Sequence, residues 1–241
     1  MLIEQVQETG QAMEFKVGNR VFDGIIFDAG TKHHILYFPD WAGCTTGYAK
    51  RKAAWLAKRL KSKVLLTDLY GAGRQPHNYT HQVESFIHST LADTKALRQE
   101  LTKFAEVCAS LMGTQLNGLS AVGVCFGGSL AFELGRAACG LRSSVSIHGT
   151  PSSYQPLRCF DDETRFLMVH GGSDPHIPMS RINEYSREMT ASKIDWRLLV
   201  LGNAVHSFTV EEIGSLGHSS RFDAKANSRA FEYSARFIEE W

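Results

Sequence analysis

The sequence predicts an α/β fold with a mostly parallel central sheet and helices on both faces. Strand-like and helix-like patterns alternate along most of the chain, which is the order that places helices over a parallel sheet. Several expected strands are continuous apolar runs, as is typical of strands buried on both faces. The length of 241 residues fits one domain, so we expect a single domain over residues 1–241.

The first elements predict an antiparallel start to this sheet. Residues 13–17 and 20–27 have the pattern of short strands, and Gly18-Asn19 between them is typical of a hairpin turn. A third strand is expected at 33–38, where the run ends in continuous apolar residues. Residues 47–61 carry apolar side chains at helical spacing with basic residues between them, which predicts an amphipathic helix.

The rest of the chain repeats strand and helix in turn. Residues 63–71 are expected to form a strand and its exit loop, and the further expected strands are 119–126, 143–149, 165–171 and 195–201. The further expected helices are two within 80–113 that separate near Ala92-Asp93, then 127–138, 178–191 and 226–241. Ligands of such sheets bind beyond the carboxyl ends of the strands, so the loops there are the place to look for a site.

Composition excludes several classes of protein. Hydrophobic residues make up 43% and charged residues 21%, which favours a globular domain over a disordered, collagen-like or coiled-coil chain. The formal net charge of +1 gives no field for nucleic acid or an anionic membrane, and we expect neither as a partner. The chain starts without a signal-peptide pattern and has no apolar run of ~20 residues. We therefore expect a cytoplasmic protein.

The five cysteines stand at positions 44, 108, 125, 139 and 159, with no CxxC pair. This is neither a disulfide framework nor a zinc-ligand spacing, and it fits a reducing compartment. We expect Cys108, in a predicted helix, and Cys139, at the end of the next one, to be buried apolar side chains. Cys159 lies in an expected loop with no motif around it.

Cys125 differs from the other cysteines because its neighbours form a motif. The segment Gly123-Val124-Cys125-Phe126-Gly127-Gly128 matches G-x-S-x-G with cysteine in place of serine, at a predicted strand-to-helix junction. The glycines let strand and helix approach closely, and the turn lifts the side chain out of the sheet. The N-terminus of the following helix favours a thiolate. Cys125 is therefore a candidate nucleophile.

A nucleophile of this kind needs a base and a group that orients the base. Asp174 follows the strand expected at 165–171, and His206 follows the strand expected at 195–201. With Cys125 they give the chain order nucleophile, acid, histidine at one edge of the sheet.

Other histidines fit that role less well. His77 and His81 have the spacing of metal ligands on a helix but no third ligand, and we expect no metal. His170 lies inside a buried-strand pattern, where a core histidine is expected. His176 is expected only to line the loop after Asp174.

These motifs resemble the dienelactone hydrolase family of the α/β-hydrolase fold. The resemblance covers nearly the whole chain and rests on the elbow at 123–128, Asp174 with Pro178 behind it, His206-Ser207-Phe208, and Asp68-Leu69-Tyr70. It implies hydrolysis of a lactone or related ester through a thiol acyl-enzyme. Cys125 would be the nucleophile, His206 the base and Asp174 the orienting group.

The resemblance also implies an oxyanion hole. One donor is the backbone N–H after the nucleophile, at Phe126, and the other comes from the loop after the third strand, at Trp41. In the family this loop carries a glutamate that contacts the resting thiol. Here the matching position is Asp40, a supporting residue that is one methylene shorter.

Substrate choice is expected to differ from that of well-studied members. Those hold the substrate carboxylate with arginines, one of them four residues after the catalytic histidine, where this chain has Val210. Arg74 is the one arginine near the other such segment. We expect a partly apolar pocket that includes Tyr70, Arg74, His148 and Phe208, although core packing is an equal alternative for the aromatic residues.

We therefore expect a hydrolase of a small-molecule ester or lactone with a Cys–His–Asp triad and no metal or organic cofactor. The chain would act as a monomer or small homo-oligomer. Two alternatives stay open, a non-catalytic ligand-binding protein of the same fold and a thioesterase or general carboxylesterase.

Overall fold

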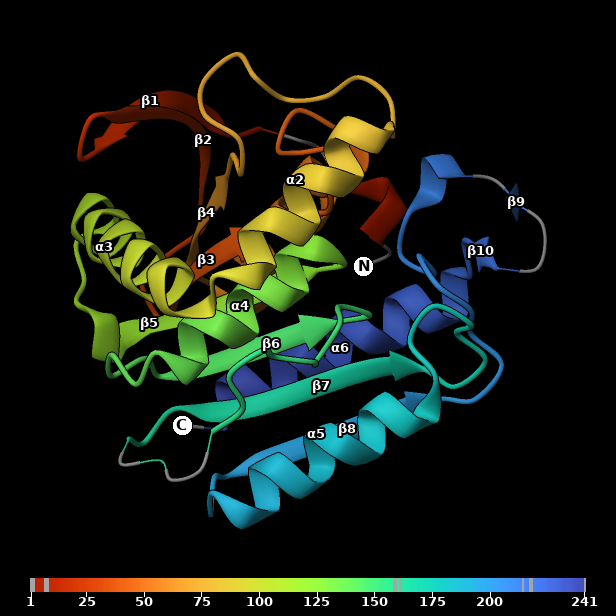
Figure 1. The fold of residues 1–241 in the computed structure, drawn as a ribbon. Helices are drawn as coiled ribbons and strands as arrows, with labels where there is room; N and C mark the ends of the chain where they lie inside the picture. The colour runs from red at the N-terminus through yellow and green to blue at the C-terminus, as the bar shows by residue number, and fades with distance from the viewer. Residues whose placement is uncertain are drawn as a thin grey trace.

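The strands expected from the sequence form one eight-stranded sheet in the computed structural model of the chain (Figure 1). The structure describes residues 3–6, 9–157, 160, 162–213, 215–216 and 219–240. The strands are β1 (Gln11–Val17), β2 (Arg20–Asp28), β3 (His34–Phe38), β4 (Lys63–Thr67), β5 (Leu119–Val124), β6 (Ser143–Ile147), β7 (Arg165–Gly171) and β8 (Trp196–Leu201). The α/β fold class is confirmed.

The strand order is β1-β2-β4-β3-β5-β6-β7-β8. β1 and β2 form the expected hairpin, β2 also pairs antiparallel with β4, and every later pair is parallel. The chain moves outward from β3 to β4 and then crosses back to β5, so the order reverses at β3. Such a reversal opens a crevice beyond the carboxyl ends of β3 and β5, where ligands of parallel sheets bind.

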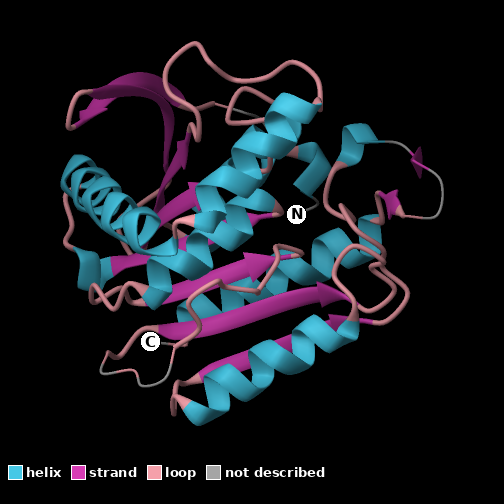
Figure 2. Cartoon of the chain, viewed as in Figure 1, coloured by secondary structure: helices cyan, strands magenta, loops and turns pink. Residues whose placement is uncertain are grey.

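Helices cover both faces of the sheet (Figure 2). They are α1 (Gly47–Leu60), α2 (His81–Ala92), α3 (Thr94–Met112), α4 (Phe126–Arg136), α5 (Met179–Ala191) and α6 (Ala224–Glu239). α1 and α6 pack on one face, and α3, α4 and α5 pack on the other, with α2 against α3. The break near residue 93 is real, because the Asp93 carboxylate caps α3 by accepting from the Ala96 N–H at 3.1 Å.

The core follows the two-residue period of the strands. In β3, Ile35 and Tyr37 point into the layer beneath α1 and α6, whereas Leu36 and Phe38 point into the layer beneath α3 and α4. All four are buried, which explains why this strand is an apolar run in the sequence.

Two strands, β5 and β6, each end two residues earlier than the sequence predicts, and backbone geometry explains both. β5 ends at Val124 because Cys125 has φ +54°, and β6 ends at Ile147 because His148 has φ +41°. β4 ends at Thr67, and the expected exit loop follows because the Asp68 carboxylate accepts from the N–H groups of Tyr70 and Gly71, both at 2.7 Å, and turns the chain.

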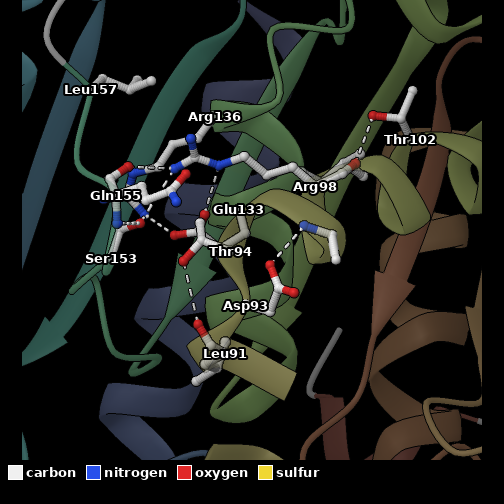
Figure 3. A network of polar contacts seen from close by, with 12 residues as sticks. Leu91, Asp93, Thr94, Arg98, Thr102, Glu133, Arg136, Ser153, Gln155 and Leu157 are labelled. Atoms are coloured by element: carbon white, nitrogen blue, oxygen red, sulfur yellow. Dashed lines mark hydrogen bonds and ion pairs between the residues drawn. The ribbon is translucent and has the colours of Figure 1, made fainter. Parts of the chain in front are cut away.

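A buried ionic network fixes α4 in the layer (Figure 3). Glu133 of α4 accepts from Arg98 of α3 at 2.9 Å and from Arg136 at 3.0 Å. Arg136 also donates to Glu188 of α5 at 2.8 Å and to the Pro151 carbonyl at 2.7 Å. The network joins α3, α4 and α5 to the loop after β6. Because buried ion pairs add little net stability, we interpret its main effect as holding α4 in a fixed position.

Shorter elements complete the secondary structure of the described residues. They are three 3₁₀ turns at Ile3–Gln5, Leu116–Gly118 and Glu211–Ile213, and a small antiparallel pair of β9 (Ser215–Leu216) and β10 (Ser220–Arg221), which the sequence analysis did not predict. β10 also forms an isolated bridge with His206. In the described part of the chain, every helix is too short or too polar to cross a membrane.

Candidate active site

A strained turn between β5 and α4 carries Cys125. Its backbone has φ +54° and ψ −120°, a conformation that side chains rarely adopt and that persists where packing enforces it. A Cβ on Gly123 would lie 2.0 Å from the carbonyl oxygen of Gly127, and one on Gly127 would lie 2.2 Å from that of Pro39. The sequence therefore needs glycine on both sides of the cysteine to bring strand and helix together, as the G-x-C-x-G spacing indicated.

The three residues singled out by chain order lie together. The Sγ of Cys125 is 3.6 Å from Nε2 of His206, and Nδ1 of His206 is 2.7 Å from Oδ2 of Asp174. The other oxygen of Asp174 accepts from the N–H groups of His176 at 2.8 Å and Ile177 at 3.1 Å. These contacts fix the carboxylate, which in turn orients the imidazole toward the sulfur.

Hydrogen bonding sets the charge of this group. Burial lowers the pKa of His206, but its hydrogen bonds to Asp174 and Cys125 outweigh burial and raise the pKa to about 10. Burial raises the pKa of Asp174, but the hydrogen bond from His206 and the two backbone N–H groups lower it overall. At neutral pH the arrangement therefore favours an imidazolium between a carboxylate and a sulfur.

The loop after β3 lies beside the elbow. Asp40 is buried and accepts from the hydroxyl of Tyr48 at 2.7 Å and from the N–H of Ala42 at 3.0 Å. Burial raises the pKa of this carboxyl. The Asp40 oxygens are directed to Tyr48 of α1 and to Ala42 in the loop, so this carboxyl group joins the loop to the helix that follows it.

Trp41 in the loop after β3 and Phe126 at the start of α4 carry the two expected oxyanion donors. Within the described residues, no hydrogen bond occupies the N–H of Trp41 or that of Phe126, the first residue of α4. The Trp41 carbonyl accepts from the hydroxyl of Tyr70 at 2.7 Å, which fixes the peptide of the loop. Free N–H groups at such a junction are suited to hold a developing oxyanion.

The expected pocket residues have different positions. His148 follows β6 and is fully buried, with Nε2 2.8 Å from Oγ1 of Thr209 and its ring centroid 5.4 Å from that of His206. Phe208 is also fully buried and packs against His148 in the core, so it lies beneath the site and supports it. Tyr70 and exposed Arg74 line one surface hollow.

Comparison with known proteins decides the family. Residues 23–241 match the dienelactone hydrolase family. The chain belongs to this family. Membership indicates a hydrolase that acts on esters.

Relatives of this dienelactone hydrolase family member include an uncharacterised protein of Caenorhabditis elegans. It is 32% identical over 126 residues, which cover 51% of this chain and 79% of the relative. A dienelactone hydrolase-like promiscuous phosphotriesterase from metagenomic libraries has a similar structure, with a TM-score of 0.78, 24% identity and coverage of 96% of this chain and 98% of that one. The structure called m3DLH has a TM-score of 0.81 at 23% identity, with the same coverage. These likenesses show the fold.

Other titratable residues lie outside the site. Cys108 is completely buried in α3, and burial raises the pKa of its thiol. Cys44 is buried with its Sγ 3.5 Å from Oε1 of Gln75. His77 and His81 are both exposed to solvent. Cys159 lies outside the described residues.

Sequence reasoning missed some residues that build the site. Tyr48 holds Asp40 and Thr209 holds His148, and both contacts join separate elements. It also missed that Cys125, His148 and His206 form one cluster, in which one ligand atom from each lies within 4.8 Å of the others. The position of His148 after a parallel strand was the available signal, but the distance to the sulfur could not be read from it.

Proposed function

We propose that this protein hydrolyses a carboxylic ester or lactone through a Cys125–His206–Asp174 triad and a thiol acyl-enzyme. The observation that carries the proposal is the chain of contacts from the Cys125 sulfur on its strained turn to His206 at 3.6 Å and on to Asp174 at 2.7 Å. A nucleophile, a base and an orienting group in hydrogen-bond reach are what covalent catalysis requires. Family membership supports the reaction class.

In the first half-reaction the Cys125 thiolate attacks the carbonyl carbon and forms a C–S bond. The carbonyl oxygen becomes an oxyanion, which the N–H groups of Phe126 and Trp41 would hold. His206 then gives its Nε2 proton to the leaving oxygen, and the ester C–O bond breaks. The alcohol departs, or stays tethered when the substrate is a lactone.

In the second half-reaction water replaces the alcohol. Neutral His206 takes a proton from water, and the resulting hydroxide attacks the thioester carbonyl. The C–S bond breaks, the acid leaves, and the thiolate is restored beside a protonated His206. Asp174 remains ionised throughout and stabilises the imidazolium, so no proton passes to it.

The side of the site that would meet the acyl or alkyl group is aromatic. The ring centroids of Tyr70 and Phe86 are 4.8 Å apart, and those of Phe86 and Phe126 are 6.1 Å apart. Val210, at the position where well-studied relatives have an arginine, is buried, and Arg74 is exposed to solvent. We infer a preference for neutral, partly apolar substrates, because a carboxylate would meet little positive charge.

The test is a panel of nitrophenyl acetate, a neutral lactone, a thioester and a carboxylated dienelactone. Each is assayed with the wild type, Cys125→Ala, Cys125→Ser and the control Cys139→Ala. We expect Cys125→Ala to lose turnover, Cys125→Ser to be crippled, and Cys139→Ala to match the wild type. An acid-quenched sample should show the mass of an acyl group on Cys125.

Three outcomes would contradict the proposal. Equal turnover by the wild type and Cys125→Ala would exclude the thiol mechanism. Binding without turnover of any ester would indicate a ligand-binding protein, and full activity of Cys125→Ser would indicate a serine-type esterase. Strong preference for the carboxylated dienelactone would overturn the inference about neutral substrates.

A further inference from the structure

We propose that Cys125, His148 and His206 form a binding site for a Zn²⁺ ion, which switches the site off. One ligand atom from each residue lies within 4.8 Å of the other two. Thiolate sulfur and imidazole nitrogen are ligands that Zn²⁺ prefers, and three protein ligands with one open position form a common zinc arrangement.

The distances fit a tetrahedral ion. Bond lengths of about 2.3 Å for Zn–S and about 2.0–2.1 Å for Zn–N, at a tetrahedral angle, place sulfur and nitrogen about 3.5 Å apart. The Sγ of Cys125 and Nε2 of His206 are already 3.6 Å apart. The ligand atom of His148 lies within 4.8 Å of the other two, so it would have to move closer by at most about 1.5 Å to complete the geometry.

Both histidines carry the outer hydrogen bond that zinc ligands need. A metal-bound imidazole donates from its other nitrogen to a carboxylate or another acceptor, which fixes the tautomer and the ring orientation. Nδ1 of His206 is bonded to Asp174 at 2.7 Å, and Nε2 of His148 is bonded to Thr209 at 2.8 Å.

A second observation points to a ligand at this place. His148 is fully buried, yet its Nδ1 has no hydrogen-bond partner within the described residues. A buried ring nitrogen without a partner is costly and calls for an explanation. When Nε2–H donates to Thr209, Nδ1 carries a lone pair, and we take this nitrogen as the zinc ligand of His148.

The local charges balance. Zn²⁺ displaces the Nε2 proton of His206, which is released to solvent. The carboxylate of Asp174 and the thiolate of Cys125 together then offset the two charges of the ion. Lys52 is the nearby cation, and it already contacts the Thr209 carbonyl and, at 3.8 Å, Glu211. Cys125 and His206 are partly exposed, so the ion can enter from the side where a substrate would approach.

The effect on turnover rests on the proposed function. Zinc would occupy the sulfur that attacks the carbonyl and the nitrogen that moves the proton. We therefore expect inhibition that a chelator reverses, whereas zinc binding itself does not depend on the protein being an esterase.

Zinc affinity is measured first, without substrate, by competition with a chromophoric chelator on chelator-treated protein. Co²⁺ in place of Zn²⁺ should give a near-ultraviolet thiolate charge-transfer band. We expect the wild type to bind one equivalent of Zn²⁺. The affinity for Zn²⁺ should fall more than about 100-fold in Cys125→Ala and in His148→Gln. It should fall about 10–100-fold in Thr209→Val, which removes an outer hydrogen bond. His176→Gln is the matched control, since its ring centroid is 5.1 Å from that of His206 but it lies outside the cluster.

Wild-type affinity in Cys125→Ala, or in both His148→Gln and Thr209→Val, would overturn the site. Equal weakening by His176→Gln or by His81→Gln on the surface would do the same. Turnover of nitrophenyl acetate with and without Zn²⁺ then tests the switch, and activation or no change would overturn it. A protein that binds zinc through these residues but cleaves no ester would contradict the proposed function and leave the metal site intact.

Discussion

Two segments border the candidate active site, the elbow at residues 123–128 and the cover formed by residues 68–92. They differ in how tightly they are packed against the rest of the molecule. In the elbow all residues except Cys125 are buried, and backbone atoms pack so closely that a Cβ on Gly127 would lie 2.2 Å from the Pro39 carbonyl oxygen. In the cover, α2 buries only Val83, and Tyr79 is 55% exposed.

This difference separates chemistry from specificity. The sulfur is placed by backbone contacts that leave no room for change, whereas the aromatic wall is placed by side chains such as Phe86, which is only half-buried. A fold can therefore keep its nucleophile while its cover changes to suit another substrate.

The largest expected effect is a loss of stability on substitution in the elbow. This substitution tests whether the backbone there is closely packed. Gly127→Ala must push Cβ against the carbonyl oxygens of Pro39 at 2.2 Å and Phe38 at 2.3 Å, both of them backbone atoms. We expect the free energy of unfolding to fall by about 4–5 kcal/mol, at the upper end for single substitutions, measured by urea denaturation. The control is Gly202→Ala, where a Cβ meets no atom within 4 Å and the change should be within about 0.5 kcal/mol. A Gly127→Ala protein as stable as the control would contradict the close packing.

The next effect is on activity without loss of the fold. Asp174→Asn removes the carboxylate that holds the His206 imidazolium, and we expect kcat to fall about 10³–10⁴-fold. NMR titration should show the pKa of His206 moving down from about 10. Asp195→Asn, at an exposed position, is the matched control and should keep the wild-type kcat. An unchanged pKa of His206 would mean that Asp174 is not what raises it.

The same ion pair predicts how stability depends on pH. The pKa of His206 is about 10 in the folded protein and near the ordinary value of 6.5 when unfolded, so the folded state binds the extra proton between these values. The contribution is fully present below pH 6.5 and is lost as the pH rises through about 10. We expect the stability advantage of the wild type over His206→Gln to shrink between pH 6.5 and 10 in urea denaturation series. A gap that stays constant over that range would show that the site does not hold the proton.

The elbow and the triad could be predicted from the sequence because local rules govern them. Glycine spacing identifies the turn, and chain order together with strand ends identifies Asp174 and His206. The placement of β4 between β2 and β3 could not be predicted, since strand order depends on contacts between distant segments. The same holds for the hydroxyl of Tyr48 on Asp40, which no local pattern indicates.

Aromatic residues show the same limit. Phe208 and Tyr70 are both buried aromatic residues near strand ends in the sequence. Phe208 is fully enclosed in the core, whereas Tyr70 packs in another core cluster and also lines a surface hollow. A loop has no fixed period of buried positions. The sequence pattern therefore cannot tell whether an aromatic side chain in a loop packs in the core or lines a pocket.

The cover should respond to change in the opposite way to the elbow. Phe86→Ala removes ring contacts with Tyr70 and Phe126 that are each worth about 0.5–1.5 kcal/mol. We expect KM for an aromatic ester to rise about 3–10-fold while kcat changes little, since the sulfur and its partners are not touched. His88→Ala on the exposed face of the same helix should change neither. A collapse of kcat in Phe86→Ala would show that cover and elbow are coupled.

The smallest expected effect lies where the two regions touch. The Tyr70 hydroxyl, from the cover, donates to the Trp41 carbonyl at 2.7 Å, and the N–H of Trp41 is a proposed oxyanion donor. Tyr70→Phe keeps the ring against Phe86 and loses only this bond, worth about 0.5–1.5 kcal/mol. If the hydroxyl acts by holding the loop, kcat should fall about two- to fivefold with KM unchanged, because only the transition state uses that donor. If Tyr70 instead contacts substrate, KM should rise with kcat unchanged, so steady-state kinetics on nitrophenyl acetate distinguish a positioning residue from a wall of the pocket.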